Sequence, residues 1–219
     1  MTIYIGDNDG LTYDYDSTNH TLSISGNGQL YDLDQGIING TVNVRDIVTC
    51  TITGNITRFS GATFMNCSAL KSVNIPDTVT WIRGYAFYSC SSLESIDIPL
   101  SVEELGTACF GGCSNLETII LRGQPILNNS TFALGSSTYC NVYSNGWAEN
   151  AFTSSVATGI FTFYTGFPTS YLYMKYHDTK LQVDSAIRDG TGKNIATSLN
   201  AKQDKIIMTD NTTYYTLTF

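Results

Sequence analysis

Charged side chains are scarce in this sequence. They make up 14% of the 219 residues, and eleven Lys and Arg against nineteen Asp and Glu give a formal net charge of −8. Nucleic acids and anionic membranes are bound by basic patches, so this balance argues against both as the main partner. A surface that is polar but weakly charged is typical of exported or virion proteins rather than of cytosolic enzymes.

Histidine is nearly absent, and so are the residue patterns of enzymes. The chain has two histidines, His20 in a predicted turn and His177 near the C-terminal end, and the sequence places neither beside a nucleophile. Glu103 and Glu104 are adjacent on a predicted loop, where their side chains diverge, so they do not form a glycosidase pair. No Gly-rich phosphate-binding motif occurs. We therefore expect no catalysis, no cofactor and no metal site.

Long apolar runs are also lacking. No stretch of about 18 apolar residues occurs, so we expect no membrane insertion. Residues 1–9 have neither the basic region nor the apolar core of a secretory signal, so we expect no signal peptide in this chain. Two locations stay open. One is the virion, as a tail appendage released by lysis, and the other is the cell surface or extracellular space.

An internal repeat dominates what is present. A period of twenty-three residues runs from about Ile47 to Leu121, with a degenerate copy first, three clear copies next and a worn fourth. Its columns include Phe64, Phe87 and Phe110; Cys67, Cys90 and Cys113; Leu70, Leu93 and Leu116; and Val73, Ile96 and Ile119. The spacing Leu-x-x-Val-x-Ile predicts a short parallel strand, and the segment around each phenylalanine predicts the return that packs from the other side. Such units are stable only when stacked, because each covers the apolar face of its neighbour.

The repeat resembles a known family. Phe87 to Pro99 reads Phe-x-x-Cys-Ser-x-Leu-x-Ser-Ile-x-Ile-Pro, which is similar to the BspA-like leucine-rich repeat of bacterial and protozoal surface proteins. The resemblance implies a mainly β fold with short helical or irregular returns. It also implies a leucine-rich repeat solenoid with an N-terminal β-hairpin cap and a C-terminal cap, followed here by a short C-terminal β/α assembly segment.

We predict three parts. Residues 1–40 form the N-terminal β cap, because 11–15 and 21–25 alternate apolar and polar residues around a turn-rich linker. Residues 41–165 form the solenoid and its C-terminal cap, with Tyr139 and Val142 at strand sites and Trp147 as either a cap residue or a sugar-stacking platform. Residues 166–219 form an oligomerisation or linker segment, since the charge balance changes from 14 acidic and five basic side chains before this boundary to five and six after it.

The C-terminal part carries a second, shorter resemblance. Residues 186–195 and 198–205 are similar to spacer segments of phage tail-fibre proteins, which associate as trimers. This implies a homotrimer through residues 178–206. The alternative is a flexible linker at the end of a surface protein.

The six cysteines suit packing better than redox or metal chemistry. The column of Cys67, Cys90 and Cys113 is a site where a small, weakly polar side chain fits the stack. Side chains on neighbouring repeats run parallel rather than toward each other, which disfavours disulfides. Zinc is disfavoured because there is no Cys-x-x-Cys pair and no nearby histidine. We predict free, buried thiols.

The residues between the core positions of each strand form the candidate binding face. They stack into three ladders: Lys71, Glu94 and Glu117; Ser72, Ser95 and Thr118; and Asn74, Asp97 and Ile120. Solenoids bind along such faces. We therefore predict a non-enzymatic recognition or adhesion module, carried on a phage tail fibre or similar receptor-binding protein. Its expected partner is a surface protein or glycan of a bacterial or host cell. The alternatives are a secreted or cell-surface adhesin and a structural spacer whose ladders are only solvated.

Overall fold

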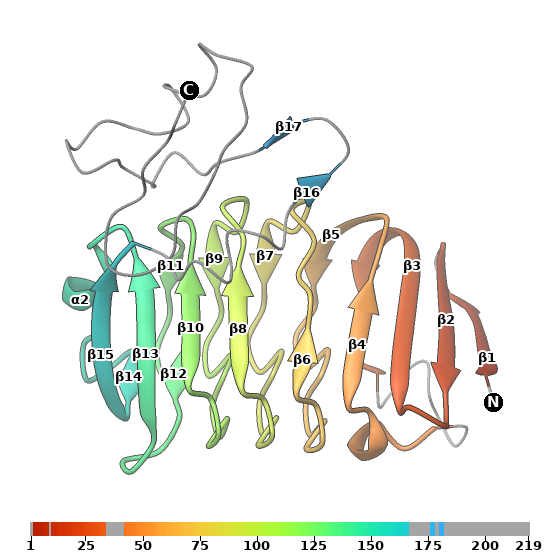
Figure 1. Cartoon of the computed structure of the whole chain (residues 1–219), viewed down its shortest axis with the longest axis horizontal. Helices are drawn as coiled ribbons and strands as arrows, with labels where there is room; N and C mark the ends of the chain where they lie inside the picture. The colour runs from red at the N-terminus through yellow and green to blue at the C-terminus, as the bar shows by residue number, and fades with distance from the viewer. Residues whose placement is uncertain (1, 9, 34–41, 167–175, 178–179, 182–219) are drawn as a thin grey trace, which may run out of the picture.

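The computed structural model describes residues 2–8, 10–33, 42–166, 176–177 and 180–181 (Figure 1). The described residues are mainly β, as predicted. The elements are β1 (Thr2–Asn8), β2 (Leu11–Asp16), β3 (Thr21–Leu30), the 3-10 helix η1 (Val44–Asp46), β4 (Thr49–Ile52), β5 (Asn55–Phe59), β6 (Ser72–Val73), β7 (Trp81–Ile82), β8 (Ser95–Ile98), β9 (Glu104–Leu105), β10 (Thr118–Leu121), β11 (Ile126–Leu127), β12 (Phe132–Ala133), β13 (Tyr139–Ser144), α2 (Ala148–Ala151), β14 (Ala157–Thr158), β15 (Ile160–Thr165), β16 (Tyr176–His177) and β17 (Lys180–Leu181).

The N-terminal strands form an antiparallel unit. β1 pairs with β2, and β2 pairs with β3 through the register Leu11↔Gly26 to Asp16↔Thr21. The turn between β2 and β3 is held by the Asp16 carboxylate, which accepts hydrogen bonds from the Thr18 N–H and the Asn19 side chain, both at 2.9 Å. The predicted hairpin is confirmed.

Strand β3 belongs to both sheets of the repeat stack. Its first half pairs in parallel with β4, and its second half pairs in parallel with β5. Gly26 lies between the two halves at φ +125°, and a Cβ there would lie 2.2 Å from the Gly10 carbonyl oxygen. Only glycine fits this bend. The N-terminal unit is therefore continuous with the stack that it covers.

Most of the remaining strands build a two-sheet solenoid, and β12 and β14 form a separate parallel pair. The first sheet runs β3–β4–β6 and continues as β8–β10–β13–β15, and the second runs β3–β5–β7–β9–β11 behind it (Figure 1). Neighbouring parallel strands are one repeat apart, as in Ser95↔Thr118 and Trp81↔Glu104. No β6–β8 pairing occurs, but the Glu94 N–H donates to the Lys71 carbonyl at 3.4 Å just before this point. The predicted solenoid is confirmed.

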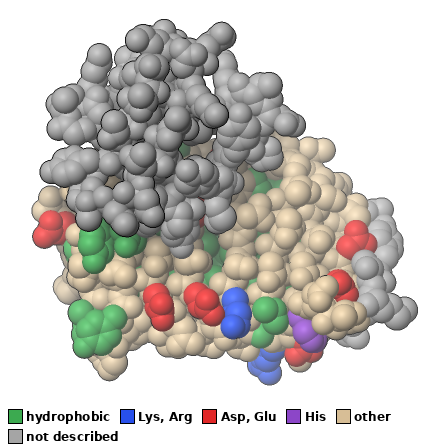
Figure 2. Space-filling model, in the orientation of Figure 1, with side chains coloured by type: hydrophobic (Ala, Val, Ile, Leu, Met, Phe, Trp, Pro, Cys, Tyr) green, Lys and Arg blue, Asp and Glu red, His purple; other side chains and the backbone are tan. Residues whose placement is uncertain are grey.

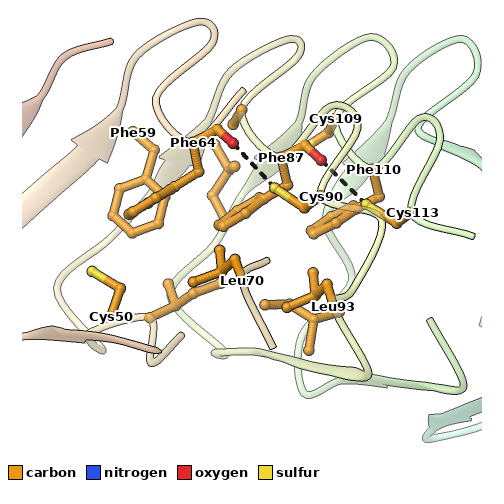
Figure 3. Packing of buried hydrophobic residues seen from close by; sticks show 14 of the residues in the cluster. Cys50, Phe59, Phe64, Leu70, Phe87, Cys90, Leu93, Cys109, Phe110 and Cys113 are labelled. Atoms are coloured by element: carbon orange, nitrogen blue, oxygen red, sulfur yellow. Dashed lines mark hydrogen bonds between the residues drawn. The ribbon is translucent and has the colours of Figure 1, made fainter. Parts of the chain in front are cut away.

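A column of phenylalanine rings runs through the core between the sheets (Figure 3). Phe64, Phe87 and Phe110 stack with ring centroids 5.2 Å apart and interplanar angles of 7° and 3°. Phe132 is one residue out of register in the sequence, yet it stacks on Phe110 at 5.3 Å. Phe152 follows at 4.9 Å and ends the stacked part of the column.

The cysteines lie in the same core. All six are free and buried, as predicted. The Cys90 thiol donates to the Phe64 carbonyl at 3.0 Å, and the Cys113 thiol donates to the Phe87 carbonyl at 3.1 Å (Figure 3). Each of these thiols therefore links its own repeat to the one before it.

The C-terminal end of the stack is closed by aromatic residues. Trp147 is half-buried against the core at the start of α2, which supports its interpretation as a cap residue. The strand β15 adds a further parallel strand beside β13, which the sequence did not indicate. Tyr139 and Val142 both lie on β13, as predicted; the Tyr139 side chain is 71% exposed, and Cys140 next to it is buried.

Beyond residue 166 the described residues are β16 and β17, which pair antiparallel. The segment predicted to form a homotrimer, residues 178–206, lies almost wholly outside the described residues. In the described part of the chain, no helix is long and apolar enough to cross a membrane.

Candidate functional site

The predicted ladders lie on the outward face of the first sheet. We name them the charged row (Lys71, Glu94 and Glu117), the polar row (Ser72, Ser95 and Thr118) and the third row (Asn74, Asp97 and Ile120). The charged row lies just before the strands, and the polar row lies on them. In the third row, Asp97 and Ile120 lie on strands and Asn74 directly follows β6. Figure 2 shows this face, with charged side chains gathered along its lower margin below a mostly polar surface.

The polar row is longer than the sequence indicated. Strand register aligns Thr21 with Thr49 and Ser72 on one side, and Ser95 with Thr118, Asn141 and Thr162 on the other. The polar row therefore comprises Thr21, Thr49, Ser72, Ser95, Thr118, Asn141 and Thr162. Adjacent strands are about 4.8 Å apart, so the seven side chains extend over roughly 30 Å.

No side chain of the polar row hydrogen-bonds to another described residue. Ser72 and Thr162 are exposed and the other five are half-buried, so all seven have some access to solvent. Hydroxyl and amide groups that are accessible and not engaged are available to a ligand. The polar row is thus a line of free donors and acceptors on a rigid sheet.

The charged row is exposed. The Lys71 ammonium lies 3.4 Å from the Glu94 carboxylate, and about 60% of each side chain is exposed. An ion pair this exposed contributes little to stability. Its charges are therefore also open to a partner.

The third row serves the fold instead. The Asn74 side-chain amide donates to the Ile52 carbonyl and accepts from the Ile52 N–H, both at 2.7 Å. Because β6 is only two residues long, this amide extends the pairing with β4 in place of a backbone peptide. Asn74 is exposed, but its polar atoms are occupied.

The other two members of the third row are likewise unavailable. Nε and Nη2 of Arg122 each lie 2.7 Å from a carboxylate oxygen of Asp97, in a mostly buried ion pair. Ile120 is fully buried, so its prediction as an exposed binding residue is wrong. The physical reason is its position in mid-sheet, between Asp97 of β8 and Tyr143 of β13, where neighbours on both sides shield an apolar side chain.

The second sheet carries an aromatic feature that the sequence analysis missed. The Arg58 guanidinium carbon lies 4.3 Å from the Trp81 ring centroid, and that of Arg83 lies 5.3 Å from it. The Trp81 indole N–H donates to Glu103 at 3.4 Å. The repeat spacing placed Arg58 and Trp81 one period apart, which was the available signal. Arg58 and Trp81 are half-buried, and such cation–π contacts stabilise the sheet surface modestly.

The described residues offer no arrangement for catalysis. Glu104 accepts a hydrogen bond from Asn128 at 2.8 Å, while Glu103 faces Trp81, so the two carboxylates point to different partners. Burial raises the pKa of the Cys113 and Cys140 thiols to about 12, which removes them as nucleophiles at neutral pH. No cluster of three metal-ligating side chains occurs within the described ranges.

One family accounts for this repeat. The profile of the BspA type Leucine rich repeat region matches residues 41–157 in six copies, which is more than half of the chain. The chain belongs to the BspA-type leucine-rich repeat family. Solenoids of this kind typically serve as non-catalytic binding scaffolds. The match does not extend to residues 178–206, so the resemblance of that segment to tail-fibre spacers gains no support from it.

Solved leucine-rich repeat structures have a similar fold. A protein of T. pallidum is 17% identical with a TM-score of 0.43, covering 63% of this chain and 70% of that one. A protein of Eubacterium ventriosum is 17% identical with a TM-score of 0.48, covering 67% of this chain and 45% of that one. A leucine-rich cell surface protein of Faecalibacterium prausnitzii is 18% identical with a TM-score of 0.37, covering 74% of this chain and 55% of that one. This chain spans about half the length of the last two. No curated protein sequence matches it.

Proposed function

We propose that this leucine-rich repeat protein is a non-enzymatic recognition module that binds a surface protein or glycan of a bacterial or host cell. The observation that carries the proposal is the polar row, whose seven aligned side chains make no hydrogen bonds to other described residues. By contrast, outward side chains that support the fold, such as Asn74 and Asp97, form hydrogen bonds to other residues of the chain. The free row, together with the charged row beside it, suits an extended ligand that runs across the strands.

Bulky charged substitutions in the polar row test this proposal. Ser95→Arg and Thr118→Arg lie in mid-row on adjacent strands, and we expect the double variant to lose at least tenfold in affinity. Thr107→Arg is the matched control, because Thr107 is exposed on the return between β9 and β10. Labelled full-length protein is titrated onto bacterial and mammalian cells and onto a glycan array. Equal binding by wild type and the double variant, with unchanged circular dichroism, would rule out this face.

We further propose that the module is displayed on a phage tail fibre or related receptor-binding appendage, as a homotrimer through residues 178–206. The scarcity of charge and the sequence of 186–205 support this version. A secreted or cell-surface adhesin is the second candidate. Phage structural genes beside this gene would favour the appendage, and an encoded upstream signal peptide would favour the adhesin. A spacer role would follow if Glu94→Lys and Glu117→Lys leave attachment unchanged along with the polar-row variants.

A further inference from the structure

The last strand of the first sheet has one edge without a partner strand. All six residues of β15 pair with β13, from Tyr139↔Ile160 to Ser144↔Thr165. Within the described residues, no strand pairs with the opposite edge of β15, which ends the sheet order β15–β13–β10–β8 (Figure 1). A free edge presents backbone donors and acceptors to any strand that approaches it.

The hydrogen bonds to β13 show which backbone groups face the free edge. The Ile160 N–H donates to the Thr138 carbonyl at 2.7 Å, and the Gly166 N–H donates to the Ser144 carbonyl at 2.8 Å. In a parallel pair, alternate residues bond to the same neighbour. The even-numbered residues of β15 therefore face β13. The N–H and C=O groups of Phe161, Phe163 and Thr165 point to the free edge.

The sequence and register of β15 lack the features by which a strand protects its own edge. Its sequence, Ile-Phe-Thr-Phe-Tyr-Thr, has no charge and no proline, and its register with β13 has no bulge. Such features are what usually prevent strand addition. At the other end of the molecule, the pairing of β1 with β2 is interrupted between Tyr4 and Gly6. One end of the solenoid is thus irregular, and the other is regular and uncharged.

The inner side chains of β15 leave the aromatic core incompletely covered. Phe161 and Phe163 contact Phe152 edge-on, with centroids 5.2 and 5.3 Å away, and both are only half-buried. Every earlier phenylalanine of the column up to Phe132 is completely buried between neighbouring repeats. An aromatic surface and an open backbone edge therefore coincide on the same strand.

We propose that the β15 edge binds the β15 edge of a second copy of this chain, antiparallel and about a two-fold axis through Phe163. In this register Phe163 faces its counterpart, and Phe161 faces Thr165 of the second copy. Each of these residues then exchanges two backbone hydrogen bonds with its opposite number, since all three direct both groups outward. A two-fold axis perpendicular to the sheet also brings the half-buried phenylalanines of the two copies together on the inner side.

A second copy suits this edge better than an unrelated partner. Because the outward groups lie on alternate residues centred on Phe163, the edge is complementary to itself. The chain carries a net charge of −8, so two copies repel through most of their surface, but β15 itself is uncharged. The dimer would be an elongated solenoid with the polar rows of both copies on one face. This inference goes beyond the proposed function and does not depend on it.

Sedimentation velocity of the full chain over a hundredfold concentration range tests the proposal. We expect a reversible association in which chains pair through β15, from monomer to dimer or, where residues 178–206 hold three chains together, from trimer to larger assemblies. Thr165→Pro removes one outward N–H and obstructs an incoming strand without removing a bond to β13. We expect it to raise the dimer dissociation constant at least tenfold. Thr107→Lys, at an exposed position on the return between β9 and β10, is the control that should leave the equilibrium unchanged.

Hydrogen exchange of the wild-type chain provides a readout that does not depend on the folding of any variant. The amides of Phe161 and Phe163 should exchange more slowly as protein concentration rises, while those of Thr162 and Tyr164 should not change. A particle mass that is the same at every concentration would overturn the proposal. So would protection of Phe161 and Phe163 that is independent of concentration, because it would show that the chain covers its own edge. An equally stable Thr165→Pro dimer would place the contact elsewhere.

Discussion

The buried cysteines connect successive repeats as hydrogen-bond donors in addition to filling space. Cys90 and Cys113 each donate to a carbonyl of the preceding repeat, at 3.0 and 3.1 Å. A thiolate could not donate, and burial disfavours its charge. Burial accordingly raises the pKa of Cys50, Cys90 and Cys109 well above the ordinary value. The protein is therefore built around thiols that must stay protonated.

Alkaline pH should unfold this protein through its thiols. In the unfolded chain a cysteine titrates near pH 8.5, whereas burial raises the pKa of Cys113 and Cys140 to about 12. The stabilisation is complete below the unfolded value and is lost as pH rises toward the folded one. Each such thiol should lower the free energy of unfolding by about 1.4 kcal/mol per pH unit across this window. Urea denaturation at pH 7, 8, 9 and 10 measures the slope.

The Cys113→Ala variant is the control for this pH dependence. It should be less stable at pH 7 because it leaves a small cavity and loses a hydrogen bond, but its stability should fall less steeply above pH 9. An unchanged slope would mean that other groups, such as Tyr15, whose pKa burial also raises, control alkaline unfolding.

At the scale of elements, a side chain completes a strand that is too short. Asn74 bonds both backbone groups of Ile52 just after the two residues of β6 end. We expect Asn74→Ala to lower the free energy of unfolding by about 1–3 kcal/mol, because it leaves the Ile52 groups without that partner. Ser72→Ala on the same strand should change it by less than about 0.5 kcal/mol. Chemical denaturation measures both, and equal effects would show that the Asn74 amide is only a surface group.

The sequence allowed the residues of the core to be predicted better than the available side chains on the outward face of the first sheet. Apolar residues at a fixed period must point inward on every repeat, so the phenylalanine, cysteine and leucine columns were sufficient for the solenoid. Whether an outward side chain is free depends on a partner elsewhere, as with Asp97 and Arg122, and the period does not identify that partner. The strand β15 was missed because Ile160–Thr165 lacks the leucine and cysteine columns, although it packs as the next repeat would.

At the scale of the whole molecule, packing is one-dimensional. Each phenylalanine of the stacked column contacts the ring before it and the ring after it, as Phe87 contacts Phe64 and Phe110. Stability in such a stack is approximately a sum of repeat and neighbour contributions. A defect in the middle therefore weakens the connection between the two halves as well as its own repeat.

Phe87→Ala tests this description. Removing a completely buried ring should lower the free energy of unfolding by about 3–5 kcal/mol. The amides before residue 87 and those after it should then show two different levels of protection from hydrogen exchange. Phe161→Ala, at the half-buried end of the aromatic core, should cost less and leave protection uniform up to β10. Equal hydrogen-exchange protection on both sides of residue 87 in Phe87→Ala would contradict this description.

Neighbouring parallel strands are one repeat apart along the chain, as in Ser95↔Thr118, so no strand of the stack must wait for a distant partner. β3 leaves the ribosome before the other parallel strands and presents an edge to both sheets at once. At about 5–20 residues per second, a repeat emerges roughly every 1–5 s. Hairpin-scale pairing takes about 1–10 μs. Each repeat thus has ample time to pair with the preceding repeat during synthesis. The solenoid therefore folds from its N-terminal end, one repeat after another.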